Sequence, residues 1–334
     1  MNDDQIAKVY KAYGLDCLSF YPVEKGYRNE SHSALLKDGR KVNLILYKYE
    51  HDIIRTIRNA NIASNFLAKK HIPVRSTIDS RIIHIKSGQW QKYASVYNYL
   101  PGETIPWEAY TRNHIKILGK AMSDMHYSLK ELTPQRFPNV SDLYLLIIDR
   151  MQDYFSNKGV VSSLSSKLNL SLSAQLLDKF RSTVVLTKSM PSQQVLHMDF
   201  VRSNILFTFS GALGELGKYE ISGIIDFEKV AFGHPFYDIA RTYAFLLVDC
   251  KFKTPDQIKK YFLHSGYEKR GKNVLDLPLL DKDGDENTIL YCLVDLFLAY
   301  DFYKFLRHNP YESLKNNEHF IRTRELLVAR RLIP

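Results

Sequence analysis

Two carboxylates and one amide occur in the middle of the chain at a spacing that suits chemistry on a phosphorylated substrate. Asp199 and Asn204 lie within the run from His197 to Asn204, which has the form H-x-D-x-x-x-x-N, and Asp226 follows in the pair Asp226-Phe227. Phosphoryl transfer from a nucleotide needs a carboxylate that positions and deprotonates the attacking hydroxyl group. It also needs an amide oxygen and a second carboxylate that hold magnesium. The pattern therefore predicts three catalytic residues: Asp199 as the base, and Asn204 and Asp226 as metal ligands.

The segments around these residues predict how they come together. Val195 and Leu196 enter the motif as a short apolar strand, and Ile205 to Phe207 leave it as a second strand. A third strand, from Ile221 to Ile225, would deliver Asp226 to the same edge, where hard oxygen ligands could converge on a magnesium ion. Each side chain alone could be an ordinary loop residue. The ordered set, with strands where they are needed, favours a kinase.

The stretch from Val195 to Ala240 resembles the aminoglycoside phosphotransferase and choline kinase superfamily, a branch of the protein-kinase-like fold. Members usually read H-G-D-x-x-x-x-N, then I-D-W/F-E/D, then G-D-P-x-x-D-L-A. Here Met198 replaces the glycine and His234 replaces the aspartate, and neither change removes a charge that the chemistry needs. The resemblance implies that His197 braces the loop and that Asp238 ties the loop backbone to the following helix.

The resemblance also implies an α+β fold with two lobes, like that of a protein kinase. A small antiparallel sheet over residues 1–100 would bind the nucleotide, and residues 101–334 would form a mainly helical lobe with the catalytic loop and the acceptor-binding helices. Such a protein would use ATP, or alternatively GTP, together with Mg²⁺. Its acceptor would be a hydroxyl group of a small metabolite or amino sugar.

A polar turn near the N-terminus is the candidate for the loop that covers the phosphates. The turn runs from Lys25 to Ser33 and precedes two strands that are joined at Lys37 to Arg40, an Asp-Gly hairpin turn. The resembled family often has G-x-x-N at this position, matched by Gly26 and Asn29. By the same resemblance, Ser31 would lie near the phosphates.

Lys48 is the candidate for the lysine that binds the α and β phosphates. It ends an apolar strand from Leu44 to Tyr47, where kinases place this lysine. Alternation puts it on the same face as Leu44 and Leu46, so its side chain is predicted to reach the cleft. Lys41 is the competing candidate. A solvated lysine at the end of a strand is the other interpretation of Lys48.

The usual glutamate partner of this lysine is not evident. The amphipathic segment from Ile53 to Lys70, predicted to be the next helix, contains no Asp or Glu. Glu50, Asn59 or Asn61 could substitute, or the pair could be absent.

A second strand candidate, Tyr93 to Tyr99, ends before Leu100-Pro101-Gly102 and resembles the hinge between kinase lobes. The resemblance implies that backbone groups of Tyr97, Asn98 and Tyr99 bind an adenine edge. Another strand is expected at 81–86.

Two more residues of the catalytic loop, Arg202 and Ser203, could contact the γ-phosphate or be simple loop residues. His126 closes a predicted helix, His114 to Leu132, and matches a histidine of the resembled family that we interpret as structural. Further helices are predicted over 142–155, 172–185, 236–248, 254–263 and 287–307, with a serine-rich loop over 162–173.

Composition narrows the class of protein. A chain of 334 residues of which 45% are hydrophobic can bury a substantial core. No apolar stretch is long enough for a membrane span, and the acidic start Met1-Asn2-Asp3-Asp4 does not resemble a signal peptide. The cysteines Cys17, Cys250 and Cys292 lie far apart without a CxxC pair. They are predicted to be free thiols in a reducing cytoplasm.

The net charge of +10 is concentrated near the N-terminus. The first 100 residues hold 16 lysines and arginines against 9 acidic residues. An electropositive small lobe suits a polyphosphate ligand. Nucleic acid is the competing partner of a basic face, but no RNA-binding motif, helix-turn-helix or zinc spacing occurs, so we do not expect it. The oligomeric state is not readable from the sequence.

Residues 276–301 have the opposite charge, with seven acidic residues against Lys282 alone. In the resembled family, helices of the second lobe build the acceptor pocket, and acidic residues there bind cationic groups. A cationic acceptor is therefore one interpretation, and a solvated acidic loop is the other. A calcium loop is excluded because Gly284 is misplaced and Cys292 stands where a glutamate is needed.

The sequence thus predicts a small-molecule kinase with an unidentified acceptor. The alternative is a pseudokinase, a nucleotide-binding or regulatory module without efficient transfer, which the missing helix glutamate supports and the intact set of Asp199, Asn204 and Asp226 opposes. A protein kinase is less favoured because the loop lacks the arginine of H-R-D and no D-F-G or A-P-E follows.

Overall fold

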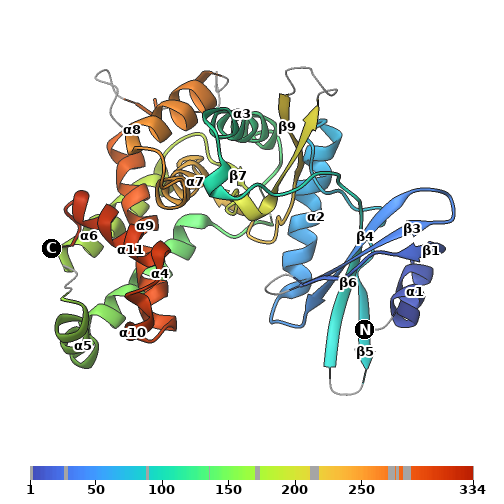
Figure 1. Cartoon of the computed structure of the whole chain (residues 1–334), viewed down its shortest axis with the longest axis horizontal. Helices are drawn as coiled ribbons and strands as arrows, with labels where there is room; N and C mark the ends of the chain where they lie inside the picture. Colours follow the sequence, from blue (N-terminus) through green and yellow to red (C-terminus); the bar gives the residue numbers. More distant parts are fainter. Residues whose placement is uncertain are drawn as a thin grey trace.

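The computed structural model of the chain describes residues 3–25, 29–87, 90–134, 136–169, 174–210, 218–269, 275, 278–280 and 287–333. Figure 1 shows an open sheet with α1 at one end of the molecule and a group of helices at the other. The expected two-lobed α+β fold, with a small antiparallel sheet and a mainly helical second lobe, is confirmed. The boundary near residue 100 stays a prediction; the last strand of the sheet ends at Asn98.

The sheet of the N-terminal lobe has the order β1-β3-β4-β6-β5, with β2 paired to β3. All of its neighbouring strands are antiparallel. The predicted hairpin at Lys37 to Arg40 joins β3 to β4, with Leu35 opposite Lys41. The strands are β1 (Cys17–Phe20), β2 (Glu24–Lys25), β3 (Glu30–Leu36), β4 (Lys41–Lys48), β5 (Ile83–Ser87) and β6 (Trp90–Asn98).

One helix covers each face of this sheet. On one face, α1 (Asp3–Ala12) packs against Leu44 and Leu46 of β4. On the other face, α2 (Ile53–Lys69) begins with residues that pack against Ile45 and Tyr47. Successive residues of a strand point to opposite faces, so β4 contributes to both cores. The helix expected over Ile53 to Lys70 is thus confirmed, whereas α1 was not predicted.

The second lobe is built around buried helices. Its core includes Phe180, Phe236 and Phe302, none of which is appreciably exposed. The longer helices are α3 (Arg112–Leu129), α4 (Val140–Ser156), α6 (Ala174–Ser189), α7 (Phe236–Asp249), α9 (Thr288–His308) and α11 (Glu318–Ala329). The shorter ones are η1 (Trp107–Ala109), α8 (Pro255–Ile258), the π-helix η3 (Lys259–Glu268) and α10 (Tyr311–Leu314).

The loop predicted over Ser162 to Ser173 is wrong for the part that the structure describes. Helix α5 runs from Lys158 to Leu168. Its first amides, of Gly159 and Val160, donate hydrogen bonds to the side chain of Asn157, and Leu164 and Leu168 are buried four residues apart. A helix cap and two leucines on one face outweigh the weak helix propensity of the serines.

All three cysteines are free thiols. No helix in the described ranges combines the length and the hydropathy needed to cross a membrane.

Candidate active site

The predicted catalytic loop lies between two short strands, as expected. Strand β7 (Gln194–Leu196) enters it, the 3-10 helix η2 (Arg202–Asn204) ends it, and β8 (Ile205–Ser210) leaves it. Strand β9 (Lys218–Ile224) pairs antiparallel with β8. The amide of Ile225 donates to the carbonyl oxygen of Asn204 over 2.9 Å, which places Asp226 beside the loop.

The Asp199 carboxylate is surrounded by donors. Its Oδ1 accepts from Arg241 over 2.9 Å, and its Oδ2 accepts from Lys229 over 2.9 Å and from Asn204 over 3.1 Å. Asp199 is 7% exposed. Burial alone would raise the pKa of this carboxyl group, but the charges of Arg241 and Lys229 outweigh burial and lower the pKa below its usual value. Asp199 is therefore ionised at neutral pH.

Helix α7 holds the loop in place through one face. Asp238 accepts hydrogen bonds from the amides of two successive loop residues, His197 over 2.8 Å and Met198 over 2.6 Å. One turn later, Thr242 donates to the carbonyl oxygen of Phe200 over 2.8 Å. Residues four apart lie on the same side of a helix, so this face fixes the backbone on both sides of the loop's carboxylate. The role expected of Asp238 is confirmed by these contacts.

Two buried histidines complete this network. The ring of His197 accepts from the amide of Asp199 through Nδ1 (3.1 Å), so its Nε2 carries the proton and donates to the carbonyl oxygen of Ile225 (3.2 Å). Burial lowers the pKa of His197, which keeps the ring neutral. His126 contacts Asp238 over 3.0 Å and the hydroxyl group of Tyr267 over 2.7 Å. Both histidines therefore brace the loop, as interpreted from the sequence.

Two site residues have left-handed backbone conformations. Met198 has a φ of 60° and Asp226 a φ of 63°. This conformation costs a residue with a side chain about 1 kcal/mol or more. Met198 is the position where the resembled family has glycine, and the structure gives the reason for a glycine there.

The donor set at the loop fits a magnesium ion bound with phosphates. The carboxylate of Asp226 is half-buried in the cleft and has no hydrogen-bond or ion-pair partner among the described residues. The side-chain nitrogen of Asn204 donates to Asp199, so its oxygen, which accepts a long 3.4 Å hydrogen bond from Ser203, is the atom that could bind a metal. The described residues contain no group of three or more His, Cys, Asp and Glu that could hold a metal by themselves. Mg²⁺ usually takes one or two carboxylates and completes its shell with water and substrate phosphates.

These residues line a cleft of about 820 Å³ between the lobes. From the N-terminal lobe it receives Ser31, Ile45 and Lys48; from the helical lobe, Asp199, Ser203, Asn204, Asp226 and Lys229.

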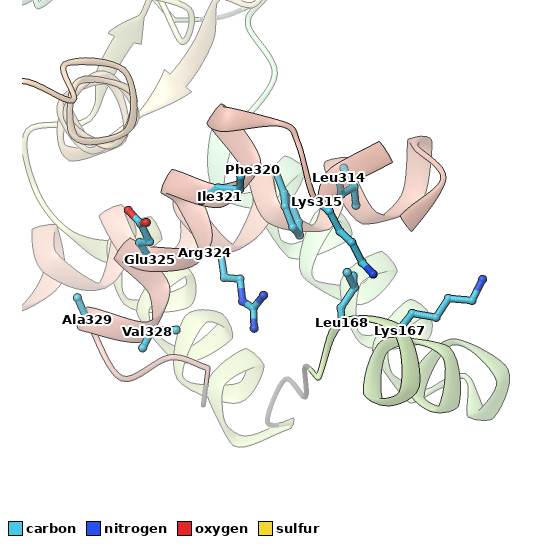
Figure 2. A pocket seen from close by; sticks show the side chains of 10 residues that line it. All are labelled: Lys167, Leu168, Leu314, Lys315, Phe320, Ile321, Arg324, Glu325, Val328 and Ala329. Atoms are coloured by element: carbon cyan, nitrogen blue, oxygen red, sulfur yellow. The ribbon is translucent and has the colours of Figure 1, made fainter. Parts of the chain in front are cut away.

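A second groove, of about 640 Å³, lies between α5, α10 and α11 at the end of the helical lobe away from the sheet (Figures 1 and 2). Figure 2 shows Phe320 and Leu168 among the side chains that line it, together with Lys315 and Arg324. None of the motif residues lines this groove. We therefore assign the site to the cleft between the lobes.

The predicted phosphate loop is described in part. Gly26 lies outside the described residues. Asn29 donates to Oε1 of Glu228 over 2.7 Å, which links the loop to the residue two positions after Asp226. Ser31 lines the cleft, where its hydroxyl group donates to Asn43 over 2.9 Å.

Lys48 lines the cleft, but the alternation argument for it is wrong. Leu44 and Leu46 face α1, on the side of the sheet away from the cleft, whereas Ile45 lines the cleft. Lys48 is the last residue of β4 and is exposed. Lys48 is still paired with Lys92 of β6, and its long, flexible side chain contributes to the cleft lining. Lys41, the competing candidate, lies instead between the rings of Tyr21 and Tyr99, 3.9 and 3.7 Å from their centroids.

No partner for Lys48 comes from α2. Asn59 donates to the carbonyl oxygen of Arg136, and Asn61 contacts Tyr97 over 2.9 Å, so neither amide is directed at the lysine. Among the described residues Lys48 has no ion pair. Glu50 lines the same cleft and is the nearest of the proposed substitutes in the sequence.

Adenine binding by the segment from Tyr97 to Tyr99 stays a prediction. The side chain of Tyr97 is buried, and its hydroxyl group bonds to Tyr47 and Asn61. The amide of Asn98 is used by the carbonyl oxygen of Ser76. Neither Tyr97 nor Tyr99 lines the cleft, and a role of Tyr99 in adenine binding stays a prediction.

Arg202 also lies outside the cleft lining, whereas its neighbour Ser203 contributes to it. Three charged residues of the site were not singled out from the sequence: Arg241, Lys229 and Glu228. Arg241 follows Asp238 by three positions on α7, which is the one signal that could have indicated it. Arg75 was also missed; it lines the cleft, and its guanidinium lies 5.7 Å from the ring of Tyr97.

Five of the seven acidic residues of the segment 276–301 lie outside the described residues. Two of its members are described, and both already pair with a cation: Asp295 with Arg330, and Asp301 with Lys304 and His319.

Comparison with known proteins agrees with this geometry. The model of the phosphotransferase enzyme family matches residues 22–256. Hydroxylysine kinase of Mus musculus is 23% identical over 195 residues, which cover 56% of this chain and 49% of that protein. Hydroxylysine kinase of Bos taurus is 22% identical over 198 residues, covering 57% and 50%. The chain spans about half the length of the curated relatives that it matches.

Solved structures share the whole fold. A microcompartment-associated aminopropanol kinase has a TM-score of 0.67 at 16% identity, covering 98% of both chains. An amicoumacin kinase, solved with AMP-PNP, Ca²⁺ and Ami, has a TM-score of 0.66 at 14% identity, covering 98% of this chain and 94% of that one.

Proposed function

Because the chain belongs to the phosphotransferase enzyme family, we propose that it transfers the γ-phosphoryl group of ATP to a hydroxyl group of a small molecule. The observation that carries the proposal is the pair of carboxylates in the cleft. Asp199 is ionised and held by donors, while Asp226 has no partner among the described residues. One carboxylate is thus ready to accept a hydroxyl group and the other to bind a metal. GTP is the alternative donor.

Asp199 acts on the acceptor. Its carboxylate accepts the hydrogen bond of the attacking hydroxyl group and takes up the proton as the oxygen–phosphorus bond forms. Arg241 is nine-tenths buried and keeps the carboxylate oriented. His197 and Asp238 hold the backbone that carries it.

Asn204 and Asp226 would hold Mg²⁺, which when bound neutralises charge on the nucleotide phosphates. Lys48, Ser31 and Ser203 line the same cleft and would bind the phosphate oxygens. Tyr99, in the connection after β6, is proposed to contact the adenine through its backbone.

The acceptor is proposed to be a small amino alcohol or hydroxy amino acid. Similar proteins are named for hydroxylysine and aminopropanol, which share a hydroxyl group and an amine. Amino sugars are the second class to test.

The test is nucleotide turnover against a panel of hydroxyl compounds. ATP and GTP are each offered with Mg²⁺ and with hydroxylysine, aminopropanol, an amino sugar or choline, and product is identified by mass. We expect phosphorylation of one class, and loss of turnover in Asp199→Ala with nucleotide affinity retained. Asp178→Ala, at an exposed position of α6, is the matched control and should behave like the wild type.

Lys48 has no ion pair among the described residues, which favours a second candidate, a nucleotide-binding module without efficient transfer. Tight nucleotide binding without transfer to any member of the panel would support that candidate. Failure to bind either nucleotide would contradict both.

A further inference from the structure

Lys229 sits at the reacting end of the cleft. It follows Asp226 by three residues and lines the cleft with Asn204. Its Nζ lies 2.9 Å from Oδ2 of Asp199, and its side chain is 51% exposed. Because the lysine is half-exposed, solvent screens this ion pair more than the buried pair of Asp199 with Arg241.

The carboxylate of Asp199 already accepts hydrogen bonds from three donors, so one of its roughly four lone-pair directions remains, on Oδ1. Arg241 occupies Oδ1, while Lys229 and Asn204 share Oδ2. A hydroxyl acceptor must hydrogen-bond to this carboxylate before it can lose its proton. Because three donors crowd the carboxylate, an acceptor that enters from the cleft is expected to displace the least firmly held one.

Burial decides which donor moves. The side chain of Arg241 is 10% exposed, and the amide of Asn204 also donates to the backbone oxygen of Asp199 over 2.9 Å. Lys229 has the only half-exposed side chain of these three donors, on a flexible four-carbon stem. Lys229 is the exchangeable donor.

We propose that Lys229 is a further catalytic residue. When the acceptor binds, its side chain moves away from Asp199 and contacts the transferred phosphoryl group. The inference rests on the proposed function. The acceptor oxygen that is hydrogen-bonded to Asp199 lies within about 3.5 Å of the γ-phosphorus atom before the reaction. A lysine that reaches the carboxylate therefore also reaches the oxygens of that phosphoryl group.

Lys229 keeps its proton and its charge throughout the transfer. The acceptor oxygen forms its bond to the γ-phosphorus as the bond from phosphorus to the β–γ bridging oxygen breaks. The electron pair of the broken bond stays on the nucleoside diphosphate, and the acceptor proton passes to Asp199. Lys229 stays protonated and donates to the equatorial oxygens, where charge builds up in the transition state. Its absence from Asp199 also frees Oδ2 to receive the proton.

The experiment compares nucleotides with and without a γ-phosphate. Dissociation constants for ADP and AMP-PNP are measured by calorimetry with Mg²⁺ and a saturating concentration of the acceptor found in the panel, for the wild type, Lys229→Met and Lys229→Arg. Lys8→Met, on the exposed side of α1, is the matched control. We expect Lys229→Met to weaken AMP-PNP binding about tenfold and to leave ADP binding unchanged. Lys229→Arg keeps the charge and should retain most of the preference for AMP-PNP.

Kinetics with the acceptor found in the panel provide the second readout. Lys229→Met should lower kcat about a hundredfold while the KM for the acceptor changes little. If Lys229 were purely structural, its substitution would change the melting temperature and would change the affinities for ADP and AMP-PNP by the same factor. Equal affinities for AMP-PNP in Lys229→Met and the wild type would overturn the role of Lys229 and leave the proposed function standing. A wild type that binds neither nucleotide would overturn both.

Discussion

The amide of Met198 donates a 2.6 Å hydrogen bond to Oδ1 of Asp238 while Met198 itself has a φ of 60°. The left-handed turn points two successive amides, of His197 and Met198, at one buried carboxylate. The strain of the turn is thus offset by charge-assisted hydrogen bonds to a fully buried carboxylate. The catalytic loop and α7 form one unit through this contact.

Asp238→Ala should destabilise the protein strongly. The substitution leaves two amides and the His126 ring without an acceptor in the core. Each unsatisfied buried donor costs about 1–3 kcal/mol, so we expect the free energy of unfolding to fall by at least about 3 kcal/mol. Urea denaturation followed by circular dichroism measures the loss. Asp178→Ala should cost less than about 0.5 kcal/mol; similar losses in both variants would contradict the role of Asp238.

Asp226→Asn should weaken the magnesium dependence of nucleotide binding. The amide keeps the shape of the side chain but removes the negative charge that holds the cation. We expect the Mg²⁺ concentration for half-maximal ATP binding to rise at least about tenfold, since even the loss of a residue that only hydrogen-bonds to a metal ligand costs that much in metal affinity. Titration of ATP affinity against Mg²⁺ measures it. An unchanged midpoint would exclude Asp226 as a ligand.

His319 should make stability depend on pH in the alkaline range. Burial alone would lower the pKa of His319, but its contacts with Asp249 and Asp301 raise it to about 9. A histidine whose folded pKa exceeds the unfolded value of about 6.5 stabilises the fold fully below that value and loses its contribution as pH rises to about 9. The loss is on the order of 3 kcal/mol. Lys304 shares Asp301, so the two cations compete for it.

Unfolding of His319→Gln measured between pH 6 and 10 is the check. The difference in unfolding free energy from the wild type should shrink as pH rises through this range. A difference that stays constant with pH would show that His319 does not titrate there.

Gly119→Ala should disrupt the packing of α3 on η3. A Cβ atom at Gly119 would lie 2.4 Å from the carbonyl oxygen of Phe262 and 2.9 Å from the amide nitrogen of Tyr267, both backbone atoms. We expect a loss of about 3 kcal/mol, at the upper end for overpacked cores. Gly159→Ala in α5 is the matched control; its Cβ meets only the Asn157 side chain at 3.3 Å. It should be neutral or slightly stabilising in thermal unfolding.

Asn29 and Glu228 should be energetically coupled. Their 2.7 Å hydrogen bond joins the N-terminal lobe to the segment after Asp226. A double-mutant cycle with Asn29→Ala and Glu228→Ala should give a coupling energy of about 1 kcal/mol, because the contact is half-buried. Asn29→Ala combined with Asp178→Ala should be additive. Additivity in both cycles would show that the contact carries no energy.

Much of the site could be predicted because its spacing is local. Asp199 and Asn204 are five residues apart on one loop, and a strand carries Asp226 back to it. Helix α2 could likewise be predicted from its apolar periodicity. The serine-rich α5 could not be predicted in this way, because the burial of Leu164 and Leu168 depends on the helices that pack against them.

Tertiary structure decided the partners of each charge. Arg241 and Lys229 meet at Asp199 because α7 and the segment after β9 pack against the loop, and no local spacing encodes that distance. Strand alternation placed Lys48 on the face of Leu44, but α1 occupies that face. Sequence by itself determines the order of the side chains and their separation along the chain. Which of them touch, and with what pKa, depends on burial between segments far apart in the sequence.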